Sequence, residues 1–311
     1  MKKQMRLWLY LPAIFVLSLA AALARTMATL GSFNFDTGYY SEKTLIFAAE
    51  ITMLLAMLVA LTYPIFHKGI RLVASFEGGR TFVAAGISSV ALLFVAFDFS
   101  RRVFGGKLVG ANVKVGNIPI IEIIGVLCVI FALASILGFF LTALSTKRED
   151  QSRAWFTLCT VVFLILYSVY IYFNTKLPIN APGKLTDMTA YIVFALFFLF
   201  ETRISLGRSI WPMYLSFGMA AVAMGVYSAL PSLAVYLING RLVSDSIYEI
   251  TLTLALTVFA AARIIGCASL SDDSDAPMVS YIKESESARL IKSEEGEQTP
   301  DGQGLTDADK E

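Results

Sequence analysis

Acidic residues embedded in apolar stretches are the most informative chemical groups of this sequence. Each of them lies within a few residues of one end of an apolar run, and they are Glu50, Asp98, Glu122 and Glu249. Charged groups at membrane depth are costly and normally face the interior of a helix bundle or water. One interpretation is a polar outer vestibule that binds a cation or a polar solute. The other is ion pairing between neighbouring helices, with Arg25 and Arg101 as partners.

A second charged group is expected near the opposite, inner ends of two later runs. It consists of Glu201, Arg203 and Arg263. Glu201 interrupts the sixth run, so the sequence indicates either a short, tilted helix or a polar inner mouth. A pair of Glu201 with Arg203 or Arg263 at the interface is the structural alternative.

Residue types that usually carry catalysis are scarce. The chain has one histidine, His67, and three cysteines, Cys128, Cys159 and Cys267, which stand alone in apolar segments. No C-x-x-C, H-E-x-x-H or phosphate-binding G-x-x-x-x-G-K-[ST] pattern occurs in the sequence. The sequence therefore indicates no catalytic residue, no cofactor and no metal site, and it argues against an enzyme.

The elements that position these groups follow from composition. Of 311 residues, 57% are hydrophobic and 16% are charged, whereas soluble chains have roughly 45–50% and about 25%. Several apolar runs exceed the roughly 18 residues that cross a bilayer, and lipid leaves no partner for an open strand edge. The predicted fold is an all-α integral membrane bundle of about eight transmembrane helices. The expected spans are 7–29, 44–66, 81–99, 118–144, 154–174, 187–206, 211–237 and 246–268.

The first span has two interpretations. Lys2, Lys3 and Arg6 precede an apolar run, and Ala22-Leu23-Ala24 resembles a signal-peptidase site. The run is longer than usual for a signal peptide, which favours a retained helix, but cleavage of residues 1–24 stays open.

Orientation is inferred from Lys and Arg in the loops. With the N-terminus inside, eleven basic residues lie on the inner side and eight on the outer side. Both termini are therefore predicted to be cytoplasmic, in a multi-pass protein of the cell membrane. The 100–117 loop conflicts with this assignment, because its four basic residues suit the cytoplasm. Its glycines and alternating apolar residues indicate either a small β-hairpin or a glycine-rich connector.

Charge divides the chain into two parts. Residues 1–270 hold 21 Lys and Arg against 12 Asp and Glu, and residues 271–311 hold 4 against 12. The second part has too few apolar residues to offset its chain entropy. We expect a transmembrane domain, 1–270, and a disordered acidic cytoplasmic tail, 271–311. The scattered basic residues argue against a nucleic-acid partner.

Two segments resemble each other in sequence. Residues 50–59 and 249–258 begin with Glu-Ile-Thr and agree at six of ten positions. A helical hairpin copied four times explains this agreement, and so does the shared composition of Leu-rich helices. Pro231 lies in the seventh, small-residue-rich span, where a kink or a helix end is expected.

These observations favour a transporter of a small solute or ion, or a subunit of one, with an acidic site in the outer leaflet. The alternative is a sensor or scaffold in the bilayer that recruits a cytoplasmic protein through its tail. The two differ in one feature: a water-filled, acid-lined cavity or a dry, ion-paired core.

Overall fold

The computed structural model describes residues 4–66, 79–106, 108–110, 113–115, 117–144, 151–207, 210–243 and 246–268. Within these ranges the chain forms eight α-helices and two short β-hairpins. The helices are α1 (Gln4–Ser32), α2 (Thr44–Phe66), α3 (Gly79–Phe104), α4 (Ile120–Leu144), α5 (Gln151–Phe173), α6 (Pro182–Ser205), α7 (Trp211–Asn239) and α8 (Ile247–Ala268). The strands are β1 (Phe33–Asn34), β2 (Tyr39–Tyr40), β3 (Lys114–Val115) and β4 (Ile118–Pro119).

All eight helices of the described residues are long and apolar enough to cross a membrane. The prediction of an all-α membrane bundle is confirmed, and the protein is a polytopic membrane protein. Several helices are longer than expected, and two of these extensions bear on the candidate site and its end of the bundle: α3 continues to Phe104, and α6 begins at Pro182, five residues before the expected start. Proline is favoured in the first turn of a helix, so Pro182 marks the true beginning of α6.

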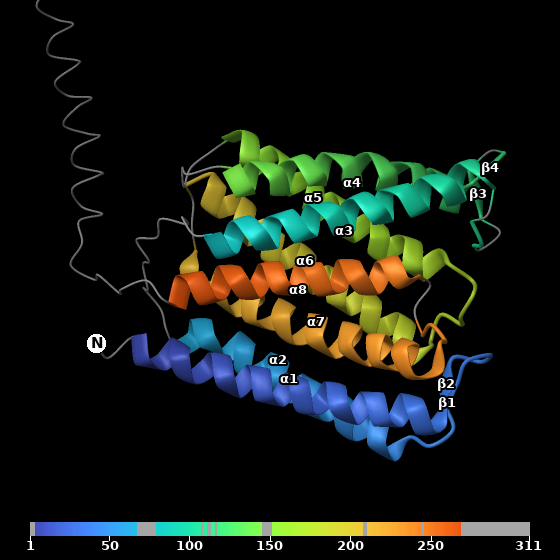
Figure 1. Cartoon of the computed structure of the whole chain (residues 1–311), viewed down its shortest axis with the longest axis horizontal. Helices are drawn as coiled ribbons and strands as arrows, with labels where there is room; N and C mark the ends of the chain where they lie inside the picture. Colours follow the sequence, from blue (N-terminus) through green and yellow to red (C-terminus); the bar gives the residue numbers. More distant parts are fainter. Residues whose placement is uncertain are drawn as a thin grey trace, which may run out of the picture. The chain divides into compact units, whose positions relative to one another are not determined.

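The helices α3 to α8 form a closed ring, because each contacts the next and α8 contacts α3. Helices α1 and α2 pack together and both contact α7 on the outside of this ring. Figure 1 shows the two β-hairpins at one end of the bundle and the beginning of α1 at the other. We call these the hairpin end and the terminal end.

Helix α4 illustrates how side-chain size divides a span between protein and lipid. Its buried positions include small residues at helical spacing, namely Gly125, Cys128, Ala132, Ser135 and Gly138. Its exposed positions are large and apolar, namely Ile130, Leu133, Leu137 and Phe140. Small residues allow close helix approach in a membrane, so the first face packs on the bundle and the second is suited to lipid.

A proline inside α2 is compensated by a neighbouring helix. Pro64 has no N–H, so the carbonyl of Ala60, four residues earlier, loses its intrahelical donor. The Ser216 hydroxyl of α7 donates to this carbonyl at 2.9 Å. The bond joins α2 to α7 where lipid offers no substitute.

Helix α7 has the same arrangement at the hairpin end. It continues through Pro231 to Asn239 and does not end there. The carbonyl that Pro231 releases belongs to Tyr227, and it accepts a hydrogen bond from Arg25 Nη1 of α1 at 3.2 Å. The guanidinium also lies 4.9 Å from the centre of the Tyr227 ring, so α1 is attached to α7 through the proline site.

The two β-hairpins differ in how well the sequence predicted them. Strands β3 and β4 form an antiparallel pair within the loop that follows α3, which agrees with the hairpin interpretation, although the hairpin is shorter and lies later in the loop. The β1–β2 hairpin was not predicted. Its turn is made by the Asn34 side chain, whose Oδ1 accepts from the amides of Asp36 and Thr37. The predicted acidic tail, 271–311, and His67 lie outside the described residues.

Candidate functional site

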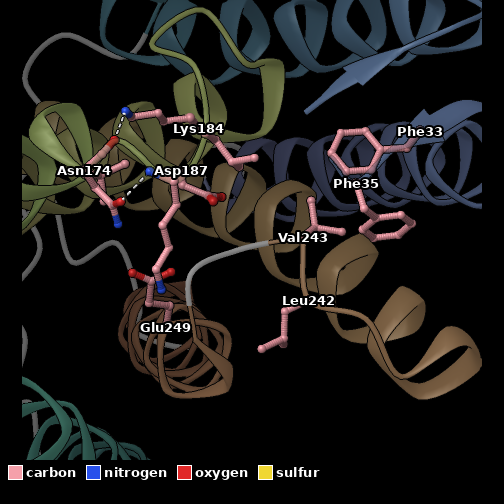
Figure 2. Close-up of a pocket in the computed structure, with 11 residues that line it drawn as sticks. Phe33, Phe35, Asn174, Lys184, Asp187, Leu242, Val243 and Glu249 are labelled. Carbon is pink, nitrogen blue, oxygen red and sulfur yellow. Dashed lines mark hydrogen bonds between the residues drawn. The ribbon is translucent and has the colours of Figure 1, made fainter. Parts of the chain in front are cut away.

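A cavity of about 240 Å³ opens at the hairpin end, and we call it the hairpin-end cavity. It is lined by Phe33, Phe35, Ile171, Asn174, Lys176, Leu177, Lys184, Asp187, Leu242, Val243 and Glu249. Figure 2 shows Lys184, Asp187 and Glu249 on one side and Phe33 and Phe35 on the other. The volume is below the roughly 300–1,000 Å³ of drug-sized ligand pockets, so the cavity suits a small molecule with a polar and an apolar part.

Lys184 is the buried cation of the cavity wall, with 5% of its surface exposed. Its Nζ donates to the backbone carbonyls of Asn174 at 2.6 Å and Tyr172 at 3.0 Å, and Figure 2 shows the first of these bonds. Helix α5 ends at Phe173, and the last carbonyls of a helix lack intrahelical partners. Lys184 therefore caps α5 and places a positive charge at the negative end of its dipole.

Asp187 lies one turn further along α6. Its Oδ1 accepts a hydrogen bond of 2.6 Å from the Ser228 hydroxyl of α7. The guanidinium of Arg25 is close enough for its charge to attract this carboxylate. Asp187 thus connects α6 with α7 while it also lines the cavity.

Glu249 lies in the first turn of α8, where the helix dipole favours an anion. Its Oε1 accepts a hydrogen bond of 2.7 Å from the Tyr167 hydroxyl of α5. The Tyr191 hydroxyl of α6 is hydrogen-bonded to Thr253 Oγ1 at 3.0 Å, one turn below Glu249. Glu249 is buried and oriented by a neutral donor within the bundle.

A second, smaller cavity shares Asp187 and Glu249 with the first and continues along α6, α7 and α8. Its volume is about 10 Å³, close to the minimum that holds one water molecule. Hydroxyl groups dominate the rest of its lining, which includes Tyr191, Ser228, Ser232 and Thr253. We call it the deep cavity, because it extends the polar surface below the two carboxylates.

The β1–β2 hairpin contributes the apolar wall. Its Tyr40 hydroxyl is hydrogen-bonded to Thr29 of α1 at 3.0 Å. Gly38 has a positive φ of 74° and is buried against the α5–α6 connection, so that a Cβ here would lie 3.1 Å from Leu177 and 3.3 Å from Ala181. Only glycine adopts this conformation without strain, and it lets the hairpin lie directly over the connection.

Aromatic rings fill the middle of the ring of helices. Phe139 of α4, Phe198 of α6 and Phe259 of α8 contact one another with centroid distances of 5.0–5.5 Å. These rings lie further along the helices than the deep cavity, toward the terminal end. They form an apolar layer between the charged groups of the two ends.

The charged groups beyond this layer form what we call the terminal-end cluster: Glu201, Arg263, Arg153 and Ser205. Arg263 donates to the Glu201 carboxylate through two nitrogens, and Arg153 Nε donates to Ser205 Oγ at 2.9 Å. Both arginines have only 1% of their surface exposed. A cavity of about 10 Å³ beside Glu201, lined in part by Thr160, is the space next to this cluster.

The four acids expected to share a vestibule are not brought together. All lie toward the hairpin end, but only Glu249 lines the hairpin-end cavity. Glu50 is exposed on α2, and Glu122 is half-buried at the start of α4. Asp98 forms an ion pair of 2.7 Å with Arg102, one turn later on α3. The physical reason is that the rotation of each helix about its own axis decides which way its acid faces. The apolar periodicity of these spans is too weak to specify that rotation.

The residues expected at the inner end also separate. Glu201 and Arg263 form the buried pair described above, whereas Arg203 is exposed on α6. Two residues on one helix do not face each other when they are two positions apart. Helix α6 is neither short nor interrupted at Glu201, since it continues to Ser205.

Sequence reasoning missed Lys184, Asp187 and Tyr167 as site residues. Lys184 and Asp187 were assigned to a loop or to its edge, because the apolar run starts only after them. The available signal was Pro182, which marks a helix that begins before the apolar run. Tyr167 had no signal, because a tyrosine in an apolar span usually packs in the core.

No group of three or more His, Cys, Asp or Glu side chains within the described ranges is arranged to hold a metal ion. Comparison of the chain with protein-family models, with curated proteins and with solved structures finds no match.

Proposed function

We propose that this protein is a transporter of a small polar solute in the cell membrane, and that the solute binds in the hairpin-end cavity. The observation that carries the proposal is the cavity itself, which brings the buried charges of Lys184 and Glu249 to one small space. Charges are retained at membrane depth chiefly where they serve a pathway or pair with one another.

The arrangement below the cavity fits a transporter closed toward the terminal end. The polar surface continues through the deep cavity and then meets the layer of Phe139, Phe198 and Phe259. Beyond the layer, Glu201 and Arg263 hold α6 and α8 together. Release on that side requires the layer to part, which a rocking of helix hairpins against one another would achieve.

We also propose that the hairpin end faces outward and that both termini are cytoplasmic, as the distribution of basic residues favours. A cysteine introduced at the exposed Asp36 of the β1–β2 turn, in a background without the three native cysteines, tests this orientation. Labelling of Asp36→Cys in intact cells by a membrane-impermeant thiol reagent supports it. Labelling only after the membrane is opened would reverse the assignment.

Transport itself is tested with a mixture of candidate solutes, so that the solute need not be chosen in advance. Proteoliposomes containing the full chain are incubated with a ¹³C-labelled extract of small metabolites, and the trapped solutes are identified by mass spectrometry. We expect at least one solute to accumulate with the wild-type protein and with Glu50→Gln, an exposed acid at the same end. Accumulation should fall with Asp187→Asn and Glu249→Gln, which keep shape and remove charge.

The alternative function, a sensor or scaffold that recruits a cytoplasmic protein, gives a different result. No solute would then accumulate above the level of protein-free liposomes, and the two cavity variants would equal the wild type. That outcome would end the transport proposal, whichever partner the tail binds.

A further inference from the structure

The hairpin-end cavity carries charges of both signs on its walls, and this property restricts what it can bind. Two of its lining residues are cationic and two are anionic, namely Lys176, Lys184, Asp187 and Glu249. A ligand with a single charge would be attracted by one pair and repelled by the other. We infer that the cavity binds a small zwitterion with an apolar body, an inference that rests on the proposed function for its site.

The anionic wall is oriented to receive an ammonium group. The Ser228 hydroxyl fixes one oxygen of Asp187, and the Tyr167 hydroxyl fixes one oxygen of Glu249. Both carboxylates are therefore held in place before a ligand arrives, which lowers the entropy lost on binding. The two residues also line the deep cavity, so the ammonium lies toward the middle of the bundle.

The cationic wall is formed by the α5–α6 connection and the first turn of α6. Lys184 uses two of its three N–H groups on the carbonyls of Tyr172 and Asn174 at the end of α5, which leaves one donor in a fixed position. Lys176 is an exposed residue whose backbone amide is fixed to Asn174 Oδ1 at 3.0 Å. An anionic group of the ligand, a carboxylate or a phosphate, lies on this side.

The opposite side of the cavity is apolar and suits the body of the ligand. Figure 2 shows Phe33, Phe35, Leu242 and Val243 facing the polar groups across the space. Two sources share this chemistry: a free amino acid with an apolar side chain, and the ethanolamine headgroup of a phospholipid. Both combine an ammonium, a nearby anion and an apolar body.

The experiment compares L-leucine with two analogues that each lack one charge. Binding to the folded state raises the melting temperature, which is measured on the purified full chain in detergent. We expect L-leucine to raise it, whereas isopentylamine, without the carboxylate, and 4-methylpentanoate, without the ammonium, do not. An equal rise with either analogue, or no rise with any zwitterion of the panel, would overturn the inference.

A second arm distinguishes the two sources. The panel includes a short-chain phosphatidylethanolamine, with phosphatidylglycerol of the same chain length as its control. A rise with L-leucine supports a free solute. A rise with the ethanolamine lipid alone supports the same binding chemistry from a lipid headgroup, and it removes the free amino acid as the solute.

Variants tie the effect to the cavity. The rise should be lost in Asp187→Asn and kept in Glu50→Gln, and Lys176→Gln, a change at an exposed residue of the cavity lining, should weaken it as well. A rise that persists in both cavity variants would place the binding elsewhere. Binding of L-leucine without accumulation of any solute in proteoliposomes would refute transport and leave this inference standing. Accumulation of a simple cation or anion alone would support transport and refute this inference.

Discussion

The two ends of the bundle both bury charged groups, but they treat them differently. At the terminal end, Glu201 and Arg263 satisfy each other directly and have at most 2% of their side-chain surface exposed. At the hairpin end, Asp187 and Glu249 are held by the neutral hydroxyls of Ser228 and Tyr167 and line a cavity of about 240 Å³. At the terminal end the carboxylate and the guanidinium are closed off against each other, whereas at the hairpin end the carboxylates also line a space that a ligand can occupy.

Structural and functional charges in a membrane bundle differ in what surrounds them. A buried carboxylate is costly in either case, so burial alone does not distinguish the two roles. What distinguishes them is the space beside the carboxylate, which is about 10 Å³ beside Glu201 and about 240 Å³ beside Asp187 and Glu249. The terminal-end cluster is therefore expected to govern stability, and the hairpin-end cavity is expected to govern binding.

The largest effect is expected from breaking the buried pair. Glu201→Gln leaves the Arg263 guanidinium buried without its counter-charge, which costs about 3–5 kcal/mol. The free energy of unfolding in detergent should fall by this amount. Arg203→Gln, an exposed arginine on the same helix, is the matched control and should have little effect. Because Glu201→Met with Arg263→Met removes both charges, the double variant should recover much of the loss; a double variant no more stable than Glu201→Gln would contradict a role in pairing.

A smaller loss is expected at the hairpin end. Tyr167→Phe removes one hydrogen bond to the Glu249 carboxylate, and bonds to charged groups contribute about 1.5–3 kcal/mol. The same unfolding measurement should show this loss, together with weaker solute accumulation, because Glu249 is no longer oriented. Tyr172→Phe, at an exposed tyrosine of the same helix, is the control. Equal behaviour of the two variants would remove the claim that Tyr167 positions Glu249.

A still smaller loss of stability is expected when the hydrogen bond to the Ala60 carbonyl, near the terminal end, is removed. Ser216→Ala removes the donor to Ala60, and interhelical hydrogen bonds in membranes contribute about 0.6–1.7 kcal/mol. Stability should fall while solute accumulation stays unchanged. In the background of Pro64→Ala, which restores an N–H to α2, the loss caused by Ser216→Ala should shrink. An unchanged loss in that background would show that the serine does not act through the released carbonyl.

The smallest effect is expected at Glu50, although its sequence closely resembles that around Glu249. Glu50→Gln changes an exposed side chain, and such changes usually alter stability by less than about 0.5 kcal/mol. Neither the melting temperature nor solute accumulation should differ from the wild type, whereas Glu249→Gln should abolish accumulation. If Glu50→Gln abolished accumulation as well, the outer acids would act together and the contrast between exposed and cavity-lining acids would fail.

The fold was predictable because lipid allows few solutions. Long apolar runs must become helices, so the eight spans, the bundle and the position of all four acids toward one end follow from the sequence. The start of α6 was not predicted, because Lys184 and Asp187 look like loop residues until Pro182 is recognised as a first-turn residue. The β1–β2 hairpin was missed because its strands have two residues each, too few for an alternating pattern.

The candidate site was predictable only in part, through Glu249. Glu50 and Glu249 both begin a Glu-Ile-Thr segment, yet one is exposed and the other is buried beside Tyr167. Their difference comes from the packing of α2 outside the ring and of α8 within it, which local sequence does not encode. The pairing of Glu201 with Arg263 likewise joins residues 62 positions apart, and the sequence offered Arg203 as an equal partner.

The most direct test of the contrast is the reactivity of two buried positions, one at each end. Val243→Cys lies in the wall of the hairpin-end cavity, and Thr160→Cys lies in the wall of the cavity beside Glu201. Each is made in a chain without Cys128, Cys159 and Cys267 and treated in the folded state with a polar thiol reagent. We expect Val243→Cys to react far faster than Thr160→Cys and to be protected by L-leucine. Equal rates, or faster reaction of Thr160→Cys, would contradict an accessible cavity at the hairpin end and a closed cluster at the terminal end.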